Sequence, residues 1–147
     1  MLRVVLDTNV VVSGLKDSKT PPGQILQLWK NNQFTVITSP QLLAEIHEVL
    51  LRQPILSLLK QTPAIVDKFI KFLIQRTFIT KGKLEIDVLK NDPDDNMVLA
   101  TAIEGQASYL ITGNIKHFPF KEYQGVKIVK PQEFSLLFEK ITHQEFD

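Results

Sequence analysis

Asp7 stands directly after an apolar, β-branched run in the stretch RVVLDTNVVVSGL, residues 3–15. A carboxylate at the end of a buried strand is costly unless something compensates its charge. Thr112, Gly113 and Asn114 likewise lie at the end of an apolar run, with Thr112 as the last residue of SYLIT (108–112). Because ligands of an open parallel sheet bind beyond the carboxyl ends of its strands, we expect these two segments to face one pocket. Further carboxylates there would repel Asp7 and take up protons unless a cation joined them.

Glu45 is a second carboxylate that can reach such a pocket. It lies in PQLLAEIHEVLLRQ (40–53), a segment with helical periodicity that Ser39 and Pro40 open as N-cap and first helical residue. On a wheel of 100° per residue, Glu45 falls at the margin of the apolar stripe, whereas Glu48 points well away from it. The alternative is that Glu45, like most lone glutamates, extends into water.

Three aspartates begin a further helix in NDPDDNMVLATAIEGQ. Asp92 is a good N-cap with Pro93 after it, and Asp94 and Asp95 complement the positive end of the helix dipole, so each has a purely structural explanation. The helical wheel separates them, because Asp95 lies above the buried side of the helix and Asp94 lies off it. We therefore expect Asp92 to cap the helix and Asp95 to point inward.

Strands and helices alternate along the chain, which predicts one α/β domain over residues 1–147. The predicted strands are 3–7, 34–38, 108–112 and 126–129. The predicted helices are 21–32, 40–53, 63–77, 92–106 and 131–140, with Pro54 ending the second and a less regular connection over 82–91. Successive parallel strands need crossover connections, so we expect a central parallel sheet between helices.

The composition is that of an ordinary globular protein, with 44% hydrophobic and 22% charged residues. The chain has no cysteine, which excludes disulfides, thiolate zinc sites and a cysteine nucleophile. We find neither a signal peptide nor an apolar run near the roughly 20 residues that a membrane span needs, and we expect a cytoplasmic protein without membrane contact. A net charge of +1 means that any nucleic-acid partner must be bound by a local basic patch.

Four segments, taken in order along nearly the whole chain, resemble the PIN-domain nucleases. They are VVLDTNVVVSGL, SPQLLAEIHEVL, DPDDNMVLATAIEGQASYLITGN and IKHFP. The likeness is closest to the bacterial branch of toxin components of toxin–antitoxin pairs (VapC-like). It implies a three-layer α/β/α sandwich, a PIN-like single domain whose acidic residues bind Mg²⁺ or Mn²⁺ and cut RNA.

The resemblance assigns roles to the acidic residues. The three acids of the family correspond to Asp7, Glu45 and Asp95, with Asp92 in a supporting place. Many members have an aspartate at the position of Asn114, and an asparagine can ligate through its carbonyl but brings no negative charge. Three acids and an amide suit Mg²⁺, which prefers oxygen ligands and keeps several waters. The missing charge leaves open whether one metal ion or two would bind.

Three further residues match polar positions of the family. Thr8 and Asn9 correspond to residues that orient the first acid, and Thr112 to the hydroxyl residue before the glycine. The resulting hypothesis is a metal-dependent endoribonuclease in which Asn114 positions a water or a second ion, giving products with a 5′-phosphate and a 3′-hydroxyl. The alternative is a weakened or inactive PIN fold that binds RNA or protein. A haloacid-dehalogenase-like phosphatase is disfavoured because it needs an aspartate at the position of Asn9.

Some residues are candidates for contacts to partners. Lys16, Lys116 and His117 are candidates for binding the RNA backbone, although single lysines are usually only solvated and His117 can equally be structural. The resemblance also implies a cognate antitoxin protein and a homodimer. The helix 63–77 has a broad apolar surface and is a candidate interface, with core packing as the alternative.

Overall fold

The computed structural model describes residues 1–90 and 92–146, so Asn91, the last residue of the predicted connection, lies outside the described part. The strands are β1 (Arg3–Leu6), β2 (Thr35–Thr38), β3 (Phe78–Ile79), β4 (Tyr109–Ile111), β5 (Glu122–Tyr123) and β6 (Val126–Val129). The helices are α1 (Thr8–Lys16), α2 (Pro21–Lys30), α3 (Pro40–Leu51), α4 (Gln53–Leu59), α5 (Pro63–Arg76), α6 (Pro93–Glu104) and α7 (Pro131–Phe146), with a short 3₁₀ helix η1 (Ile115–His117).

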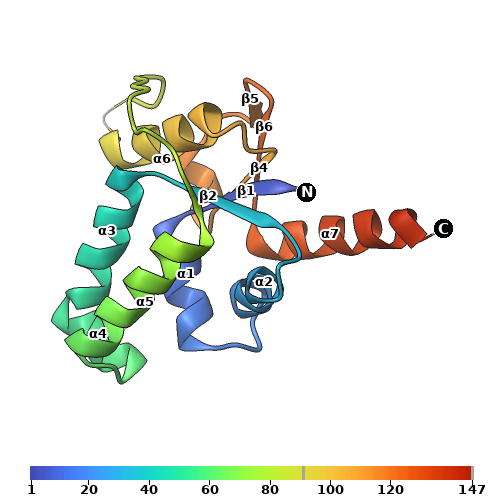
Figure 1. Cartoon of the computed structure of the whole chain (residues 1–147). Coiled ribbons are helices and arrows are strands. Elements are labelled where there is room, and N and C mark those ends of the chain that lie inside the picture. Colours follow the sequence, from blue (N-terminus) through green and yellow to red (C-terminus); the bar gives the residue numbers. More distant parts are fainter. Residues whose placement is uncertain (91, 147) are drawn as a thin grey trace.

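The strands form one sheet in the order β3-β2-β1-β4-β6-β5. All neighbouring pairs are parallel except β5 and β6, which form an antiparallel edge. Helix α6 packs on β1, β2 and β4, and Figure 1 shows α1, α2 and α7 on the other side of these strands. The predicted α/β/α sandwich is therefore confirmed, with the addition of the antiparallel edge strand.

The central strands place the site. In the register, Leu6 lies beside Ile111, so β1 and β4 end next to each other. Asp7 follows the first of these ends, and its backbone N–H donates to the carbonyl of Ile111 at 3.0 Å. Val5 and Leu110, one residue earlier on each strand, are completely buried. The polar residues after the two strands thus extend from a rigid apolar base.

Two helices were not expected from the sequence. The run NVVVSGL belongs to α1, because Asp7 caps the helix and Val10 and Val11 face the core. At Gly14 of α1 a Cβ atom would lie 2.6 Å from a methyl carbon of Leu26, so glycine allows α1 to approach α2 closely. The prediction that Pro54 ends α3 omitted α4, since a proline is also well suited to the first turn of a new helix. The two-residue strands β3 and β5 also escaped prediction, being too short to show an alternating pattern.

Aromatic side chains close the core beneath the sheet. Phe134 of α7 is completely buried, with its ring centroid 5.5 Å from that of Phe34 and 5.6 Å from that of Tyr109. On α5, Leu73 is buried and the ring of Phe72 lies 5.2 Å from that of Trp29. Much of the broad apolar surface of α5 is therefore used in packing. Among the described residues, no helix is long and apolar enough to cross a membrane.

Candidate metal centre

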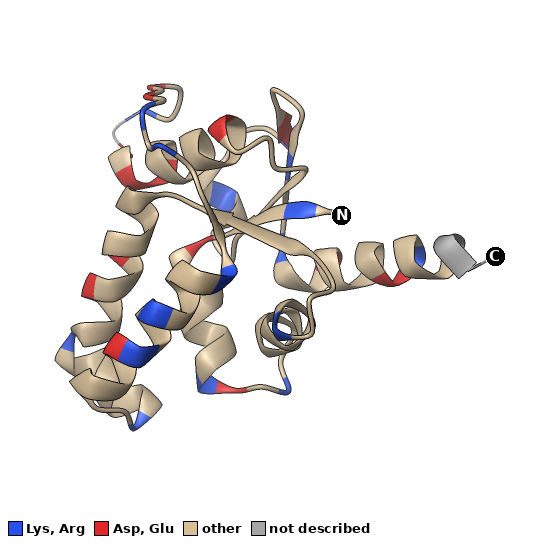
Figure 2. Cartoon of the chain, in the orientation of Figure 1, with Lys and Arg blue, Asp and Glu red and all other residues tan. Residues whose placement is uncertain are grey.

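A pocket of about 420 Å³ lies at the carboxyl ends of β1 and β4. It is lined by Asp7, Thr8, Asn9, Val12, Ser13, Glu45, Val49, Ile55, Asp92, Asp94, Asp95, Val98, Asn114 and His117. Five of these residues are acidic, and within the described part of the chain no lysine or arginine lines the pocket. Figure 2 shows acidic residues at the N-terminal end of α6, near the start of α3. The pocket is therefore rich in negative charge. Among its described lining residues, His117 is the only side chain that can carry a positive charge.

Asp7 is held by hydrogen bonds to both carboxylate oxygens. The backbone N–H of Thr8 donates to Oδ1 at 2.8 Å, and the Thr112 hydroxyl donates to Oδ2 at 2.8 Å. Only 5% of the residue is exposed, and this burial raises the pKa of Asp7 although the hydrogen bonds oppose the shift. The carboxylate is thus oriented but only partly compensated.

Thr8 and Asn9 both hydrogen-bond to Asp7, as expected for residues that orient it, and each also contacts a second part of the site. The Thr8 hydroxyl donates to the carboxylate of Glu45 rather than to Asp7. The Oδ1 atom of Asn9 accepts a hydrogen bond from the backbone N–H of Gly113 at 2.8 Å, which ties the ends of β1 and β4 together. Asn9 also lowers the pKa of Asp7 through a side-chain hydrogen bond.

Glu45 lies on α3 as the helical wheel predicts, half-buried at the pocket, whereas Glu48 is exposed and pairs with Arg52 at 3.3 Å. Burial raises the pKa of Glu45, and the charges of Asp7 and Asp94 raise it further. The hydrogen bond from Thr8 works in the opposite direction. Like-charge repulsion therefore reaches Glu45 from two different elements.

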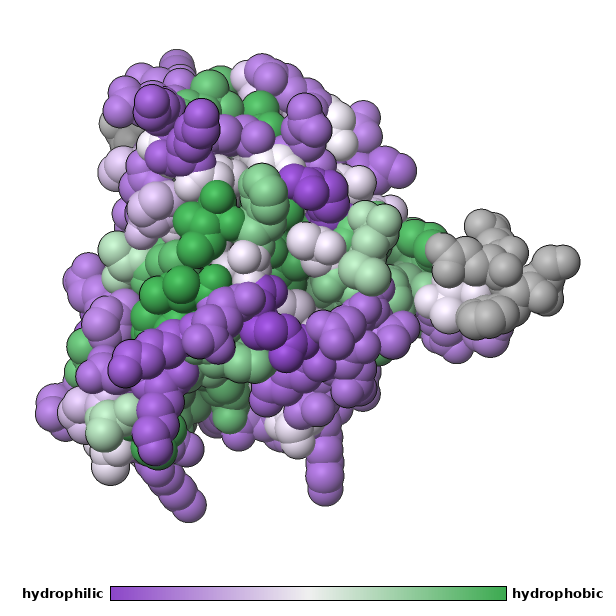
Figure 3. Space-filling model, viewed as in Figure 1, coloured by the Kyte–Doolittle hydropathy of each residue, from purple (hydrophilic) through white to green (hydrophobic). Residues whose placement is uncertain are grey.

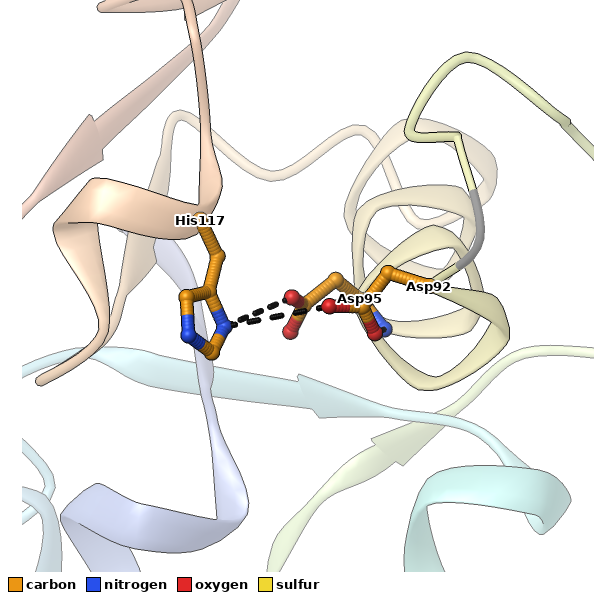
Figure 4. Close-up of side chains that lie close together, drawn as sticks. All are labelled: Asp92, Asp95 and His117. Carbon is orange, nitrogen blue, oxygen red and sulfur yellow. Dashed lines mark hydrogen bonds and ion pairs between the residues drawn. The ribbon is translucent and has the colours of Figure 1, made fainter.

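Asp95 and Asp92 face His117 across the pocket (Figure 4). The ring Nδ1 atom of His117 lies 2.9 Å from Asp95 Oδ2 and 3.9 Å from Asp92 Oδ2. Asp92 caps α6 as predicted, accepting the N–H of Asp95 at 3.2 Å. Burial, reinforced by Asp92, raises the pKa of Asp95 to about 7, whereas hydrogen bonding to Asp95 holds the pKa of Asp92 below its usual range.

Thr112 and Asn114 follow the end of β4, and only Asn114 reaches the pocket. Thr112 is completely buried, and its hydroxyl also accepts the backbone N–H of Asn114 at 3.0 Å. Asn114 is exposed and lines the pocket. The structure therefore brings together Asp7, Glu45, Asp95 and Asn114, the four residues that the sequence selected.

The structure separates the three candidates for binding RNA. His117 lines the pocket and contacts Asp95, whereas Lys116 is exposed on η1 beside it without lining the pocket. Lys16 is exposed in the last turn of α1, roughly 12 Å along the helix from its first residue. Only Lys116 and His117 therefore adjoin the acidic residues.

Asp94 was not selected from the sequence although it lines the pocket and raises the pKa of Glu45. Its position off the buried face of α6 was expected, and it is exposed. Side chains in the first turn of a helix incline toward the N-terminus, so they reach a pocket at that end from more than one face. Its position in the first turn of the predicted helix was the sequence feature by which Asp94 could have been selected.

The donor set fits a divalent cation with oxygen ligands. Asp7, Glu45 and Asp95 all have raised pKa values, which means that their ionised forms lack a sufficient counter-charge in the protein. A divalent ion supplies that charge, and carboxylates are the ligands that Mg²⁺ and Mn²⁺ favour.

Without a divalent cation, we expect the melting temperature to fall as the pH rises from about 4 to about 7. The pKa of Asp95 in the folded protein is about 7, above its ordinary value of 3.8, so the folded state binds more protons than the unfolded state over this interval and loses stability as the pH rises. Asp7 and Glu45 shift in the same direction, and Asp92 in the opposite one.

Thermal unfolding in EDTA at about pH 5 and pH 7.5 measures this effect. The Asp95→Asn variant should show a flatter profile, because its side chain cannot ionise. A wild-type melting temperature that rises over the interval, or an equally steep profile in the variant, would contradict the assignment.

Comparisons with known proteins identify the family and similar folds. Residues 3–116 match the family model of the PIN domain. An uncharacterized protein of Methanocaldococcus jannaschii, MJ1680, is 29% identical over an alignment that covers 95% of this chain and 93% of the relative. The fold is similar to a chain of VapBC2 from Rickettsia felis bound to a promoter DNA fragment, with 19% identity, a TM-score of 0.57, and coverage of 88% of this chain and 98% of the other. The fold is also similar to a chain of DNA-bound VapBC from Salmonella typhimurium, with 16% identity and a TM-score of 0.60. This match covers 89% of this chain and 99% of the other.

Proposed function

This chain belongs to the PIN domain family, and on that premise we propose that it is a Mg²⁺- or Mn²⁺-dependent endoribonuclease, the toxin component of a toxin–antitoxin pair. The observation that carries the proposal is the meeting of Asp7, Glu45 and Asp95 in one pocket. They come from three elements that are far apart in the sequence, and their pKa values are all raised.

The residues of the pocket have separate tasks in the proposed reaction. Asp7, Glu45 and Asp95 would hold the cation. Thr112 fixes Asp7, and Thr8 links Asp7 to Glu45 through its backbone N–H and its hydroxyl.

The exposed amide of Asn114 is placed to orient a water or a phosphate oxygen at the rim. When bound, a divalent cation lowers the pKa of the attacking water and neutralises charge on the leaving oxygen. Attack of water on phosphorus, with breakage of the bond to the 3′-oxygen, which takes up a proton, leaves a 5′-phosphate and a 3′-hydroxyl.

RNA cleavage in the presence and absence of a divalent cation tests the proposal. We expect labelled single-stranded RNA to be cut in Mg²⁺ or Mn²⁺ and left intact in EDTA, with 5′-phosphate and 3′-hydroxyl ends. Cleavage in EDTA, or 2′,3′-cyclic phosphate ends, would contradict it, since cyclic ends mean that the RNA's own 2′-hydroxyl attacks. Calorimetric titration with Mn²⁺ distinguishes an inactive fold, which should show no binding that depends on Asp7.

The partners are part of the same proposal. We infer that RNA phosphates contact Lys116, which is exposed beside the pocket, and that Lys16 contributes only if the RNA extends along α1. An antitoxin protein is proposed because the two solved neighbours are named as VapBC complexes.

A homodimer is proposed through the apolar side chains that α5 and β3 leave exposed. Ile74 is 50% exposed and Phe78 51% exposed, and Figure 3 shows apolar surface in this region. Light scattering, which gives the mass of the protein in solution, tests the dimer separately from the nuclease activity. A monomeric mass at micromolar concentration would overturn this part of the proposal.

A further inference from the structure

The geometry points to a second cation site, formed by Asp92, Asp95 and His117, that favours Zn²⁺ or Co²⁺ over Mg²⁺. It differs from the oxygen-only set of Asp7, Glu45 and Asp95 by including an imidazole. The inference rests on the proposed function only in that Asp95 belongs to both sets. Asp95 has two carboxylate oxygens, so one residue can serve two neighbouring ions.

The distances between the three side chains suit a shared ion. One ligand atom from each residue can be chosen so that all lie within 4.8 Å of one another. Ligand atoms bound at about 2.1 Å to one ion lie about 3.0 Å apart in octahedral geometry and about 3.4 Å apart in tetrahedral geometry. The separations from His117 Nδ1, 2.9 Å to Asp95 and 3.9 Å to Asp92, lie on either side of these values. Only small side-chain movements are needed to bring the three ligand atoms to the separations found around one ion.

Asp92 can serve this site without giving up its structural role. Its Oδ1 atom accepts the backbone N–H of Asp95, which fixes the carboxylate at the start of α6, while Oδ2 faces His117 (Figure 4). Asp92 thereby adds a negative charge to the lining of the pocket. Asn114, which also lines the pocket, adds none. Asp92 thus acts as the N-cap through Oδ1 and also has a second oxygen that faces an imidazole.

His117 is fixed by its own segment. Its backbone N–H donates to the carbonyl of Asn114 at 2.9 Å, closing the turn of η1. Its side chain is 49% exposed and that of Asp92 39% exposed, so an ion has access from solvent, and water can complete the coordination. Asp95, with a side chain only 9% exposed, forms the inner wall.

A second acid–imidazole pair gives a comparison within the same chain. His47 Nε2 lies 3.0 Å from Asp67 Oδ1, but in the described part of the chain no third acid or imidazole lies close enough to join this exposed pair. Among the described residues, Asp92, Asp95 and His117 are the only group of three such side chains whose ligand atoms already lie within 4.8 Å of one another, whereas the oxygens of Asp7, Glu45 and Asp95 must move closer together to share an ion. The added nitrogen sets the selectivity, because imidazole suits Zn²⁺ and related transition metals whereas Mg²⁺ prefers oxygen ligands.

Titration of the full chain with Zn²⁺, followed by nitrogen NMR of ¹⁵N-histidine-labelled protein, tests the site. The chain has three histidines, so three sets of ring signals can be assigned from single His→Gln variants. We expect Zn²⁺ to shift the Nδ1 signal of His117 to the range of a metal-bound nitrogen and to leave the other two unchanged. Calorimetry should show Zn²⁺ affinity at least about 10-fold weaker in His117→Gln and Asp92→Asn, with Mg²⁺ affinity changed far less in His117→Gln.

The matched control is His47→Gln, which removes the imidazole of the two-residue pair and should leave Zn²⁺ affinity unchanged. A His117 signal that does not move at saturating Zn²⁺, an absence of Zn²⁺ binding, or an equal loss of affinity in His47→Gln would overturn the site. If Zn²⁺ moves the signal but the protein cuts no RNA in Mg²⁺, the nuclease proposal fails and the site stands. If RNA is cut and the signal stays in place, only the site fails.

Discussion

Replacing Asp7 by asparagine is expected to lower the rate of Mg²⁺-dependent RNA cleavage by at least about 100-fold. Loss of a residue that merely orients a metal ligand typically costs 10–100-fold, and Asp7 is assigned as a ligand itself. Asparagine has nearly the same shape, and its carbonyl oxygen can still accept a hydrogen bond from Thr8 or Thr112. The charge is therefore the main property that changes.

The stability of the Asp7→Asn variant separates this explanation from misfolding. Because burial raises the pKa of Asp7, the ionised carboxylate destabilises the metal-free protein near neutral pH. We expect the variant to melt in EDTA at the wild-type temperature or above it, and to lose most of the stabilisation that Mg²⁺ gives the wild type. Asp67→Asn, which removes an exposed acid outside the pocket, should retain wild-type cleavage. A fully active Asp7→Asn protein would refute the assignment.

Replacing Phe134 by alanine is expected to destabilise the protein by about 3–5 kcal/mol. The side chain is completely buried, and its ring contacts those of Phe34, Tyr109 and Phe138, so truncation leaves a cavity between α7 and the sheet. For a chain of this length, the melting temperature should fall by roughly 10 °C.

Leu136→Ala on the same helix is the matched control for Phe134→Ala. Leu136 is 57% exposed, so its truncation should change the free energy of unfolding by no more than about 0.5 kcal/mol. Denaturant unfolding measures both variants. Equal losses of stability would contradict the assignment of this stabilisation to the buried aromatic contacts, because alanine lowers the helical propensity of neither position.

The positions of the three acids could be predicted because each follows from a short-range rule. Asp7 comes directly after a buried strand, Glu45 lies at the margin of an apolar stripe, and Asp95 lies above one. Parallel pairing then brings the strand ends together, as the neighbouring ends of β1 and β4 show. Each of these rules predicts where a side chain points from the residues of its own helix or strand alone.

The rest of the site depends on contacts between elements that no local pattern describes. The Thr8 hydroxyl could equally have bonded to Asp7, and its donation to Glu45 depends on where α3 lies against α1. Asp92 and His117 face each other only because of the path that η1 takes after β4. Helix α1 itself was missed because a run of three valines favours a strand, and the cap at Asp7 and burial of Val10 and Val11 outweigh that preference.

A crystal of the protein soaked in Mn²⁺ gives the most direct test of the central claim, that Asp7, Glu45 and Asp95 hold a divalent cation at the ends of β1 and β4. We predict an anomalous difference peak in this pocket, within coordination distance of carboxylate oxygens of Asp7 and Asp95. The peak should be absent from an Asp7→Asn crystal soaked in the same way. A wild-type pocket without a peak, at a Mn²⁺ concentration that supports RNA cleavage, would contradict the claim.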